Sequence, residues 1–246
     1  MAGSAGRKSK IYMDGLRGDN FLNSIDIPLT VDMLDTTIFN SSGAKEYTNA
    51  NADATLSAGG LWEGSSSESD NFFQTLVSST ATKVINWYPN NDTLGNFGFG
   101  IEMYEASYTA NSPIDGVVSI SVDGQANSAR HSVESLRALS TANTTGSLSA
   151  TTAAGTADDN TASSTKNGIG WFQRVDNTTG AIVPRIQHSN NNSTWDTLLS
   201  FSSGTTRNGQ RVAAGTATIK RYTRAQWTIT GSSTLAFNFN FGFTRL

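Results

Sequence analysis

The amino-acid sequence predicts a mainly β protein, and three observations carry that prediction. Hydrophobic residues make up 37% and charged residues 15% of the 246 residues, both below the shares found in ordinary globular domains. Ser, Thr and Asn fill about a third of the chain, and these side chains suit turns and solvated sheet faces better than helix interiors. The segment 234–243, TLAFNFNFGF, alternates between large apolar residues and small or polar ones, which is the period of a strand.

The first half of the chain is expected to form short strands and one helix. At 69–78, Ser69 can cap the first turn, Asp70 suits the N-terminal end of the helix dipole, and four apolar side chains fall on one face. The segment 132–139 fits either a helix or a strand. The expected strands are 10–13, 24–29, 35–39, 83–88, 97–108 and 117–122.

The second half has a clearer strand pattern and is expected to form a small β-sandwich or jelly-roll-like domain. About six short strands separated by polar turns have the spacing of such domains. On the last strand Phe237, Phe239 and Phe241 point to one side with Leu235 and Phe243, so this strand can complete a core of its own. The other strands are expected at 169–175, 181–188, 195–201, 217–222 and 226–229.

A stretch poor in large apolar residues divides the chain. Residues 140–166 contain one such residue, Leu148, so this stretch cannot bury a core and is expected to be a linker or a long surface loop. The predicted organisation is a first domain at 1–145, a linker at 146–164 and a second domain at 165–246.

Charge is distributed unequally between the two halves. Residues 1–150 hold 8 basic and 16 acidic side chains, whereas residues 151–246 hold 9 and 4. The resulting net charges, −8 and +5, indicate two surfaces with different roles.

A second polar stretch, 40–69, is expected to be a long loop between two strands. It is interrupted by Leu56, Leu61 and Trp62, for which the sequence offers no obvious partner within the chain. Long loops in compact domains are often functional, and exposed apolar side chains mark protein contacts. We therefore expect these three residues to contact a neighbouring subunit.

The sequence contains no constellation typical of an enzyme. The absence of Cys excludes thiol nucleophiles, disulfides and metal–thiolate sites. His131 and His188 lack neighbouring metal-ligand patterns and are expected at the surface or in turns. Glu102 and Glu105 have opposite parity on one expected strand, so they face opposite sides of a sheet and do not form a catalytic pair. We expect no catalytic site, no cofactor and no metal.

Two clusters in the second half have both a structural and a binding interpretation. Four aromatic residues could form a sugar-binding platform, but the three Trp side chains share strand faces with apolar residues, which favours core packing. Lys220, Arg221 and Arg224 could contact phosphate, but a solvated strand face is the simpler interpretation. The aromatic residues are Trp171, Trp195, Trp227 and Tyr222.

The first half resembles the major tail tube proteins of long-tailed, non-contractile bacteriophages. A short N-terminal arm leads into a strand at 9–15, a polar excursion follows at 40–63, and the amphipathic helix comes next. The stretch NFGFGIEMYEASYTANSPIDGVVSISVDGQ at 96–125 is similar to that family's paired β run. The resemblance covers roughly residues 7–140 and consists of patterns, not a signature motif.

The second half resembles a β-sandwich module that is appended to phage tail and virion proteins. The stretch GAIVPRIQHSNNNSTWDTLLSF at 180–201 and the C-terminal FTRL carry this likeness. The fold that the two resemblances imply is a tail-tube-like domain of two packed β-sheets with one flanking helix, followed by a C-terminal β-sandwich domain.

The resemblance also implies a function, as a structural virion protein with no enzymatic activity. Tail tube subunits close into hexameric rings that stack into a channel for genome ejection, and their long loop and N-terminal arm bridge between rings. The implied partners are copies of the chain itself and other tail proteins, while DNA passes without specific binding. The implied location is the viral tail, after synthesis in the host cytoplasm, and no apolar run is long enough for a membrane span.

A channel for DNA must not trap the negatively charged duplex, so its lining is expected to carry acids and amides. Asn86 and Glu102, on two expected strands, are the candidates for that lining. The alternatives are a capsid decoration protein or another phage structural protein, and a carbohydrate-binding module carried by residues 165–246. A glycosidase is the weakest alternative.

Overall fold

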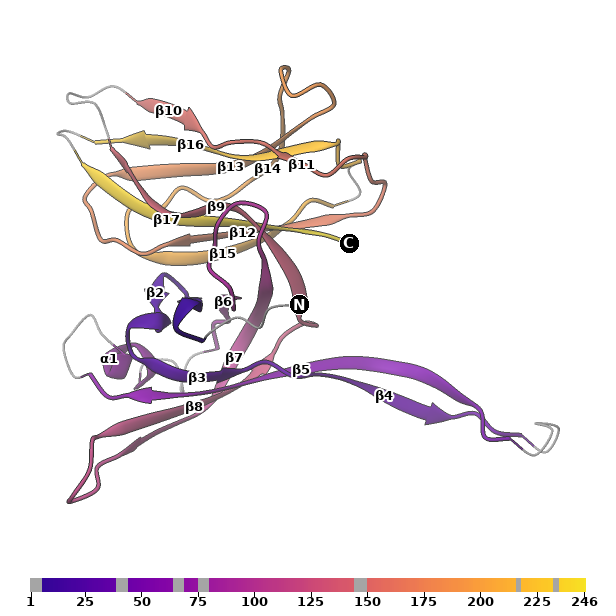
Figure 1. Cartoon of the computed structure of the whole chain (residues 1–246), viewed down its shortest axis with the longest axis vertical. Coiled ribbons are helices and arrows are strands. Elements are labelled where there is room, and N and C mark those ends of the chain that lie inside the picture. The colour runs from indigo at the N-terminus through magenta and orange to yellow at the C-terminus, as the bar shows by residue number, and fades with distance from the viewer. Residues whose placement is uncertain are drawn as a thin grey trace. The chain divides into compact units, whose positions relative to one another are not determined.

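In the part of the chain that the structure describes, the regular structure is almost entirely antiparallel β, with one short α-helix (Figure 1). This confirms the predicted fold class. Its strands group into two compact units, each assembled from separate stretches of sequence. Unit 1 comprises Met1–Asn20, Lys83–Gly100 and His131–Leu246, and unit 2 comprises Phe21–Thr82 and Ile101–Arg130. The computed structural model describes residues 6–38, 44–63, 69–74, 80–143, 150–215, 218–231 and 235–246.

Unit 1 contains two packed sheets. Its elements are η1 (Gly6–Lys8), β1 (Lys10–Met13), β2 (Leu16–Arg17), η2 (Gly18–Asn20), β6 (Lys83–Tyr88), residues 97–100 of β7 (Phe97–Asn111), β9 (His131–Asn143), β10 (Thr151–Ala154), β11 (Asp158–Asp159), β12 (Gly168–Arg174), β13 (Ala181–Ser189), β14 (Asp196–Ser200), β15 (Asn208–Ala213), β16 (Tyr222–Thr230) and β17 (Ala236–Arg245). The first sheet has the order β15-β12-β17-β9-β7-β6-β1-β2. The second has the order β10-β16-β13-β14, with β11 also paired to β16.

The core between these sheets is built on the alternation of β17. Phe237, Phe239 and Phe241 are fully buried, as the period-2 pattern predicts. The Trp227 ring of β16 meets the Phe239 ring edge-on, with centroids 5.2 Å apart, and Phe172 of β12 lies 5.1 Å from Phe241. Such tilted aromatic pairs add to the free energy of area burial. This cluster joins β12 and β17 of one sheet to β16 of the other.

Unit 2 is built around one long strand. Its elements are β3 (Leu22–Asp26), β4 (Leu29–Asp35), β5 (Tyr47–Leu61), α1 (Ser69–Gln74), residues 101–111 of β7, and β8 (Ser119–Ala126). The 15-residue β5 pairs with β3 and β8 through its second half and with β4 through its first half. β8 then pairs with β7.

The helix α1 packs on this sheet through Phe73, which is 1% exposed. The Phe73 ring stacks on Tyr108 of β7 at 5.7 Å and meets Phe21 edge-on at 6.2 Å. The Tyr108 hydroxyl donates a 2.5 Å hydrogen bond to Oδ1 of Asp70, at the start of the helix. The predicted helix is thus confirmed from Ser69 to Gln74, and its expected continuation at 75–78 lies outside the described residues.

Several predicted strands are confirmed, and two segments, 35–39 and 40–69, were misread. β4 ends at Asp35, and residues 36–38 form no strand. Strands at 10–13 and 83–88 have the predicted bounds, and 132–139 is a strand, part of β9. The stretch 40–69 is not one long loop, because β5 occupies much of it. There the buried alternation runs through Ala54, Leu56 and Ala58, and small Ala side chains made this half-buried strand look polar.

In the second half, β15 was missed, and the strand expected at 217–222 is not formed in its described part. Ile219 makes only an isolated bridge to Ser164, and β16 begins at Tyr222. Two strands, β10 and β11, lie within the predicted linker at 146–164. Strand pairing needs only backbone groups, and Ala153 of β10 is small enough to pack against the core opposite Trp227.

The two compact units do not divide the chain at the predicted linker. β9, from the predicted first domain, pairs with β17, from the predicted second domain, over most of its length. β1 and β6 also belong to unit 1. Residues 165–246 supply strands to both sheets of unit 1 alongside strands from earlier in the chain.

Candidate interaction surfaces

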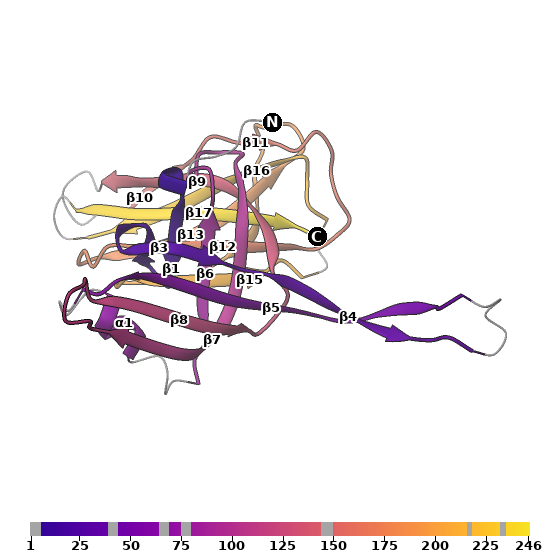
Figure 2. The ribbon, with the colours of Figure 1, turned by 60° about the horizontal axis from the view of Figure 1, so that its bottom comes forward.

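The most unusual surface of unit 2 is a ribbon formed by β4 and the first half of β5. The two strands pair from Leu29 opposite Ala54 to Asp35 opposite Tyr47, and they extend beyond β3 and β8 as a free two-stranded ribbon (Figure 2). Every residue of β4 is exposed. A two-stranded hairpin alone is marginally stable in water, so this ribbon is a candidate for packing against another molecule.

The two faces of the ribbon differ in chemistry. Strand alternation places Leu29, Val31 and Met33 on one face with Tyr47, and also with Asp35 and Asn49. The four apolar side chains are 41%, 42%, 56% and 51% exposed. The opposite face carries Thr30, Asp32, Leu34, Thr48 and Asp53. One face is therefore mostly apolar, with Asp35 at the end of β4, and the other is mostly polar and acidic apart from Leu34. A contiguous exposed apolar face of this kind marks a protein interaction site.

The three residues expected to contact a neighbouring subunit have different environments. Leu61 and Trp62 are 47% and 41% exposed, and their role as contacts stays a prediction. Leu56 is 1% exposed in the core of unit 2. The basis for its assignment, the lack of a partner within the chain, does not hold, because β5 directs Leu56 inward between the buried Ala54 and Ala58.

The two residues expected to line a channel also differ. Asn86 is fully buried and accepts a 2.9 Å hydrogen bond from Nε2 of Gln173. It cannot line a channel, because β6 lies between β1 and β7 and is covered on both faces. Glu102, on β7, is partly exposed and accepts a 2.6 Å hydrogen bond from the Thr82 hydroxyl. Its role stays a prediction.

The difference in net charge is larger between the two compact units than between the two halves of the sequence. Unit 2 contains 12 acidic and 2 basic residues, a net charge of −10, and unit 1 contains 8 and 15, a net charge of +7. Together they give the −3 of the whole chain. The sequence alone understated this separation because β1, β6 and β9, from the first half, belong to the basic unit.

The predicted basic cluster is a set of separate contacts on unit 1. Lys220 forms an ion pair with Asp196, and Arg221 forms one with Asp159 at 2.6 Å. Arg224 instead donates two hydrogen bonds to Oε1 of Gln187, at 2.9 and 2.8 Å. Lys220 and Arg221 thus face carboxylates, whereas Arg224 faces an amide.

The predicted packing of the aromatic residues in the core is confirmed for two of the four side chains. Trp171 and Trp227 are 0% and 7% exposed, as predicted from their strand faces. Trp195 and Tyr222 are only partly buried, and each lies beside a guanidinium.

One acidic pair in unit 1 has an unusual environment. Glu134 of β9 and Asp158 of β11 share a hydrogen bond near Arg245 of β17. Burial first, and then the charge and hydrogen bond of Asp158, raise the pKa of Glu134 to about 7. A carboxyl group that is protonated near neutral pH is what permits two acids to pair.

The two histidines differ in exposure. His188, expected at the surface or in a turn, is instead buried on β13, where Nδ1 accepts a 3.3 Å hydrogen bond from the backbone N–H of Lys220. Burial lowers the pKa of both His188 and His131, with further lowering by Lys220 and Arg211 respectively. In the described part of the chain, no group of three or more His, Cys, Asp and Glu could hold a metal ion. No helix there is long and apolar enough to cross a membrane.

The chain matches no protein-family model and no curated protein. Among solved structures, a chain of the virion of a native gene transfer agent particle is 14% identical, with a TM-score of 0.44 over 52% of this chain and 97% of that one. The Dit protein of phage SPP1, described as a hub of the adsorption apparatus, is 10% identical, with a TM-score of 0.35 over 94% and 98%. The SPP1 tail tube protein is 8% identical, with a TM-score of 0.37 over 52% and 78%.

Proposed function

We propose that the chain is a structural subunit of a phage tail, specifically a major tail tube protein that closes into hexameric rings and stacks them into a channel. The observation that supports self-assembly most directly is the β4–β5 ribbon. Its apolar face, with Met33 56% and Tyr47 51% exposed, has no cover from unit 2, and burial of such surface drives association. The tail-specific part of the proposal comes from the sequence resemblance at residues 7–140.

The charge of unit 2 suits the proposed channel. Duplex DNA carries about one negative charge per 1.7 Å of axis and adheres to Lys and Arg surfaces. A unit with 12 acidic and 2 basic residues repels the phosphate backbone, so it can lie next to DNA without trapping it. We propose that unit 2, including Glu102, supplies the channel lining, and that Leu61 and Trp62 contact a neighbouring subunit.

Negative-stain microscopy of concentrated protein tests the assembly. We expect six-fold rings or hollow tubes from the unaltered chain. A double variant with Val31→Asp and Met33→Asp places charge on the apolar face of the ribbon and should leave folded single subunits. The matched control, Thr30→Asp with Thr48→Asp, adds the same charge to the opposite face and should still assemble.

Three outcomes would contradict the proposal. Folded protein that forms no ring at any concentration would rule out self-assembly by this chain alone. Flat three-fold assemblies would favour a capsid decoration protein. Equal assembly by both double variants would show that the apolar face of the ribbon is not the contact.

A further inference from the structure

The second sheet of unit 1 has a polar outer face whose central side chains form a regular pattern. On β13 and β16, Arg185 lies opposite Gln226, and Gln187 lies opposite Arg224. The alternate residues of the same strands, including Ile186 and Trp227, are buried in the core, so these four side chains share the outer face. Along each strand an arginine is followed on this face by a glutamine, and each arginine lies opposite a glutamine of the neighbouring strand.

Hydrogen bonds hold this pattern together. Arg185 donates from Nη1 to Oε1 of Gln226 at 3.3 Å, and Gln226 is only 7% exposed. Arg224 donates from Nε and Nη2 to Oε1 of Gln187. Each amide oxygen thus fixes a neighbouring guanidinium, which reduces the side-chain entropy that a ligand contact would otherwise cost.

These two guanidiniums retain much of their hydrogen-bonding donor capacity. Neither forms an ion pair with a carboxylate among the residues that the structure describes, in contrast to Lys220 and Arg221 nearby. A guanidinium has five N–H donors, of which these contacts use one on Arg185 and two on Arg224. The amide NH₂ group of Gln187, which is partly exposed, adds further donors.

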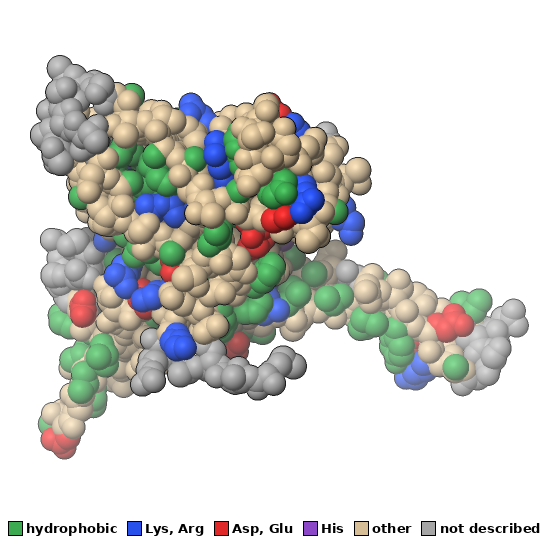
Figure 3. Space-filling model, turned by 45° about the horizontal axis from the view of Figure 1, so that its top comes forward, with side chains coloured by type: hydrophobic (Ala, Val, Ile, Leu, Met, Phe, Trp, Pro, Cys, Tyr) green, Lys and Arg blue, Asp and Glu red, His purple; other side chains and the backbone are tan. Residues whose placement is uncertain are grey.

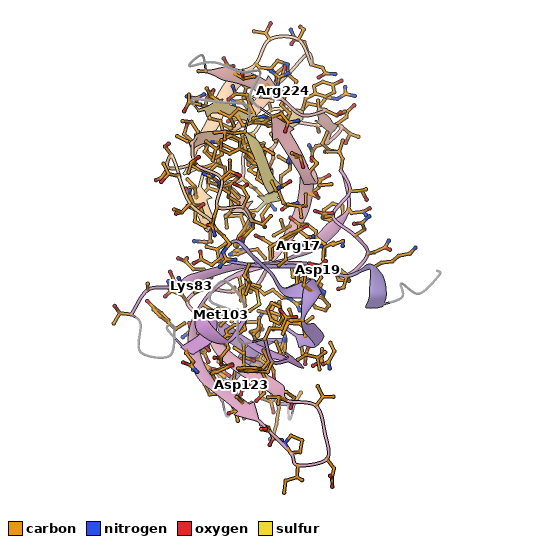
Figure 4. All side chains as sticks on the ribbon, turned by 90° about the vertical axis from the view of Figure 1, so that its left-hand side faces the viewer. Arg17, Asp19, Lys83, Met103, Asp123 and Arg224 are labelled. Carbon is orange, nitrogen blue, oxygen red and sulfur yellow. The ribbon has the colours of Figure 1, made fainter. Side chains whose placement is uncertain are left out.

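Trp195 extends the face with an aromatic surface. It precedes β14, is partly exposed, and its ring centroid lies 4.0 Å from the Arg224 Cζ. Figure 4 shows Arg224 at the end of unit 1 that carries the second sheet. In the upper part of Figure 3 the surface is mostly uncharged, with Lys and Arg groups and a few Asp and Glu groups among the other side chains. An aromatic ring beside fixed polar donors suits a sugar ring, which offers both an apolar face of C–H groups and hydroxyl acceptors.

We propose that this Arg–Gln face, formed by Arg185, Gln187, Arg224, Gln226 and Trp195, binds an acidic polysaccharide. Charge complementarity identifies the occupant: two unneutralised guanidiniums, within a unit of net charge +7, fit carboxylate or phosphate groups in bidentate geometry. Trp195 and the amide donors fit the sugar chain that carries those groups. The inference concerns unit 1 alone and holds whether or not the chain forms a tail tube.

Binding of the full chain to four immobilised polymers tests the proposal. Polygalacturonate carries carboxylates on sugar rings, phosphomannan carries phosphates on sugar rings, dextran is a neutral polysaccharide, and polyglutamate is acidic without sugar. We expect binding to at least one of the first two, weaker binding to polyglutamate, and none to dextran. The first two polymers distinguish a carboxylate ligand from a phosphate ligand.

Two variants and a matched control connect binding to the face. Arg185→Gln with Arg224→Gln should weaken binding about tenfold or more, because it removes both charge-assisted contacts. Trp195→Ala should weaken binding to the acidic polysaccharide and leave polyglutamate unchanged. Lys8→Gln with Lys166→Gln removes two exposed charges from unit 1 outside the face and should bind as the unaltered chain does.

The proposal is overturned if the folded chain binds neither acidic polymer, or if the arginine variant and the lysine control bind equally. Equal binding to polyglutamate and to polygalacturonate would reduce the face to a general anion surface and would also refute it. If the arginine variant instead abolishes association between copies of the chain and polysaccharide binding is absent, the face is an interface with the acidic unit 2 of a second copy. Circular dichroism and thermal melting establish that each variant is folded.

Discussion

The Tyr12 hydroxyl donates a 2.7 Å hydrogen bond to Oδ2 of Asp92, 80 residues further along the chain. The same carboxylate accepts from the backbone N–H of Leu139 at 2.6 Å and from Nδ2 of Asn240 at 3.1 Å. Asp92 is 4% exposed, and a buried charge needs such partners to offset its desolvation. One side chain therefore links β1, β9 and β17 within unit 1.

We expect Tyr12→Phe to lower the free energy of unfolding by about 1.5–3 kcal/mol, the usual contribution of a hydrogen bond to a charged group. Burial and the neighbouring Asp92 raise the pKa of Tyr12, so the hydroxyl stays a donor at ordinary pH. Chemical denaturation measures the change, and Tyr104→Phe, at a side chain 41% exposed, serves as the control. Equal stability of the two variants would show that the Asp92 network adds little.

The same network and the β9–β17 pairing predict that the two ends of unit 1 cannot be separated. A chain truncated near residue 147 loses β17, the pairing partner of β9 from Ala236 opposite Asn143 to Phe243 opposite Glu134. It also loses the aromatic core of the sandwich, so Leu136, which is 1% exposed, would lie in water. We expect this truncated chain to be insoluble or to lack cooperative unfolding.

Thermal melting and size-exclusion chromatography of the truncated chain check this expectation. A soluble, monodisperse product that melts cooperatively would mean that residues 1–145 fold as an independent domain, as the sequence pattern predicts. The chain altered only by Ile114→Ala, at a fully exposed position, controls for handling during purification.

The element types were readable from the sequence where alternation is carried by large side chains. The five-residue apolar face of the last strand, centred on Phe239, predicted both the strand and the core. The same reasoning failed for β5, whose buried side includes Ala54 and Ala58, because Ala contributes little to a hydrophobic pattern. The domain division was not readable, since the pairing of β9 with β17 depends on backbone hydrogen bonds between segments about a hundred residues apart.

The candidate surfaces were readable to a smaller extent. The sequence indicated Leu61 and Trp62, and the structure leaves both exposed. It could not separate Arg224 from the neighbouring Lys220, because which basic side chain finds a carboxylate depends on cross-strand register. Arg185 gave no signal on its own, and only its position opposite Gln226 shows the Arg–Gln face.

The contrasting environments of Leu56 and Leu61 predict that substitution by Ala changes the free energy of unfolding by very different amounts at the two positions. Leu56→Ala removes a fully buried side chain from unit 2 and should lower the free energy of unfolding by about 2–5 kcal/mol. Leu61→Ala removes a side chain that is 47% exposed and should change the stability of the free subunit by less than about 0.5 kcal/mol.

If Leu61 contacts a neighbouring subunit, Leu61→Ala should raise the protein concentration needed for assembly. Denaturation of the free subunit and light scattering during assembly separate the two effects. Assembly of Leu61→Ala at the unaltered concentration would remove Leu61 from the set of contacts. A Leu56→Ala subunit as stable as the original would contradict its assignment to the core.

Glu134 predicts a pH dependence of stability with a definite sign. Its pKa is about 7 in the folded chain, against an ordinary value of 4.5, so the folded state holds this proton more tightly than the unfolded state. The stabilisation is fully present below pH 4.5, declines as the pH rises between the two values, and is lost above about pH 7. Above that pH, the Glu134 carboxylate lies beside the Asp158 side chain, with Arg245 nearby.

Glu134→Gln keeps a side chain that can donate a hydrogen bond to Asp158 and removes the titration of residue 134. We therefore expect the variant to unfold at a higher denaturant concentration than the original at pH 8 and to match it at pH 4. Glu46→Gln, at an exposed position, should follow the original at both pH values. Parallel curves for Glu134→Gln and the original across this range would show that Glu134 is ionised throughout and that the carboxyl pair does not share a proton.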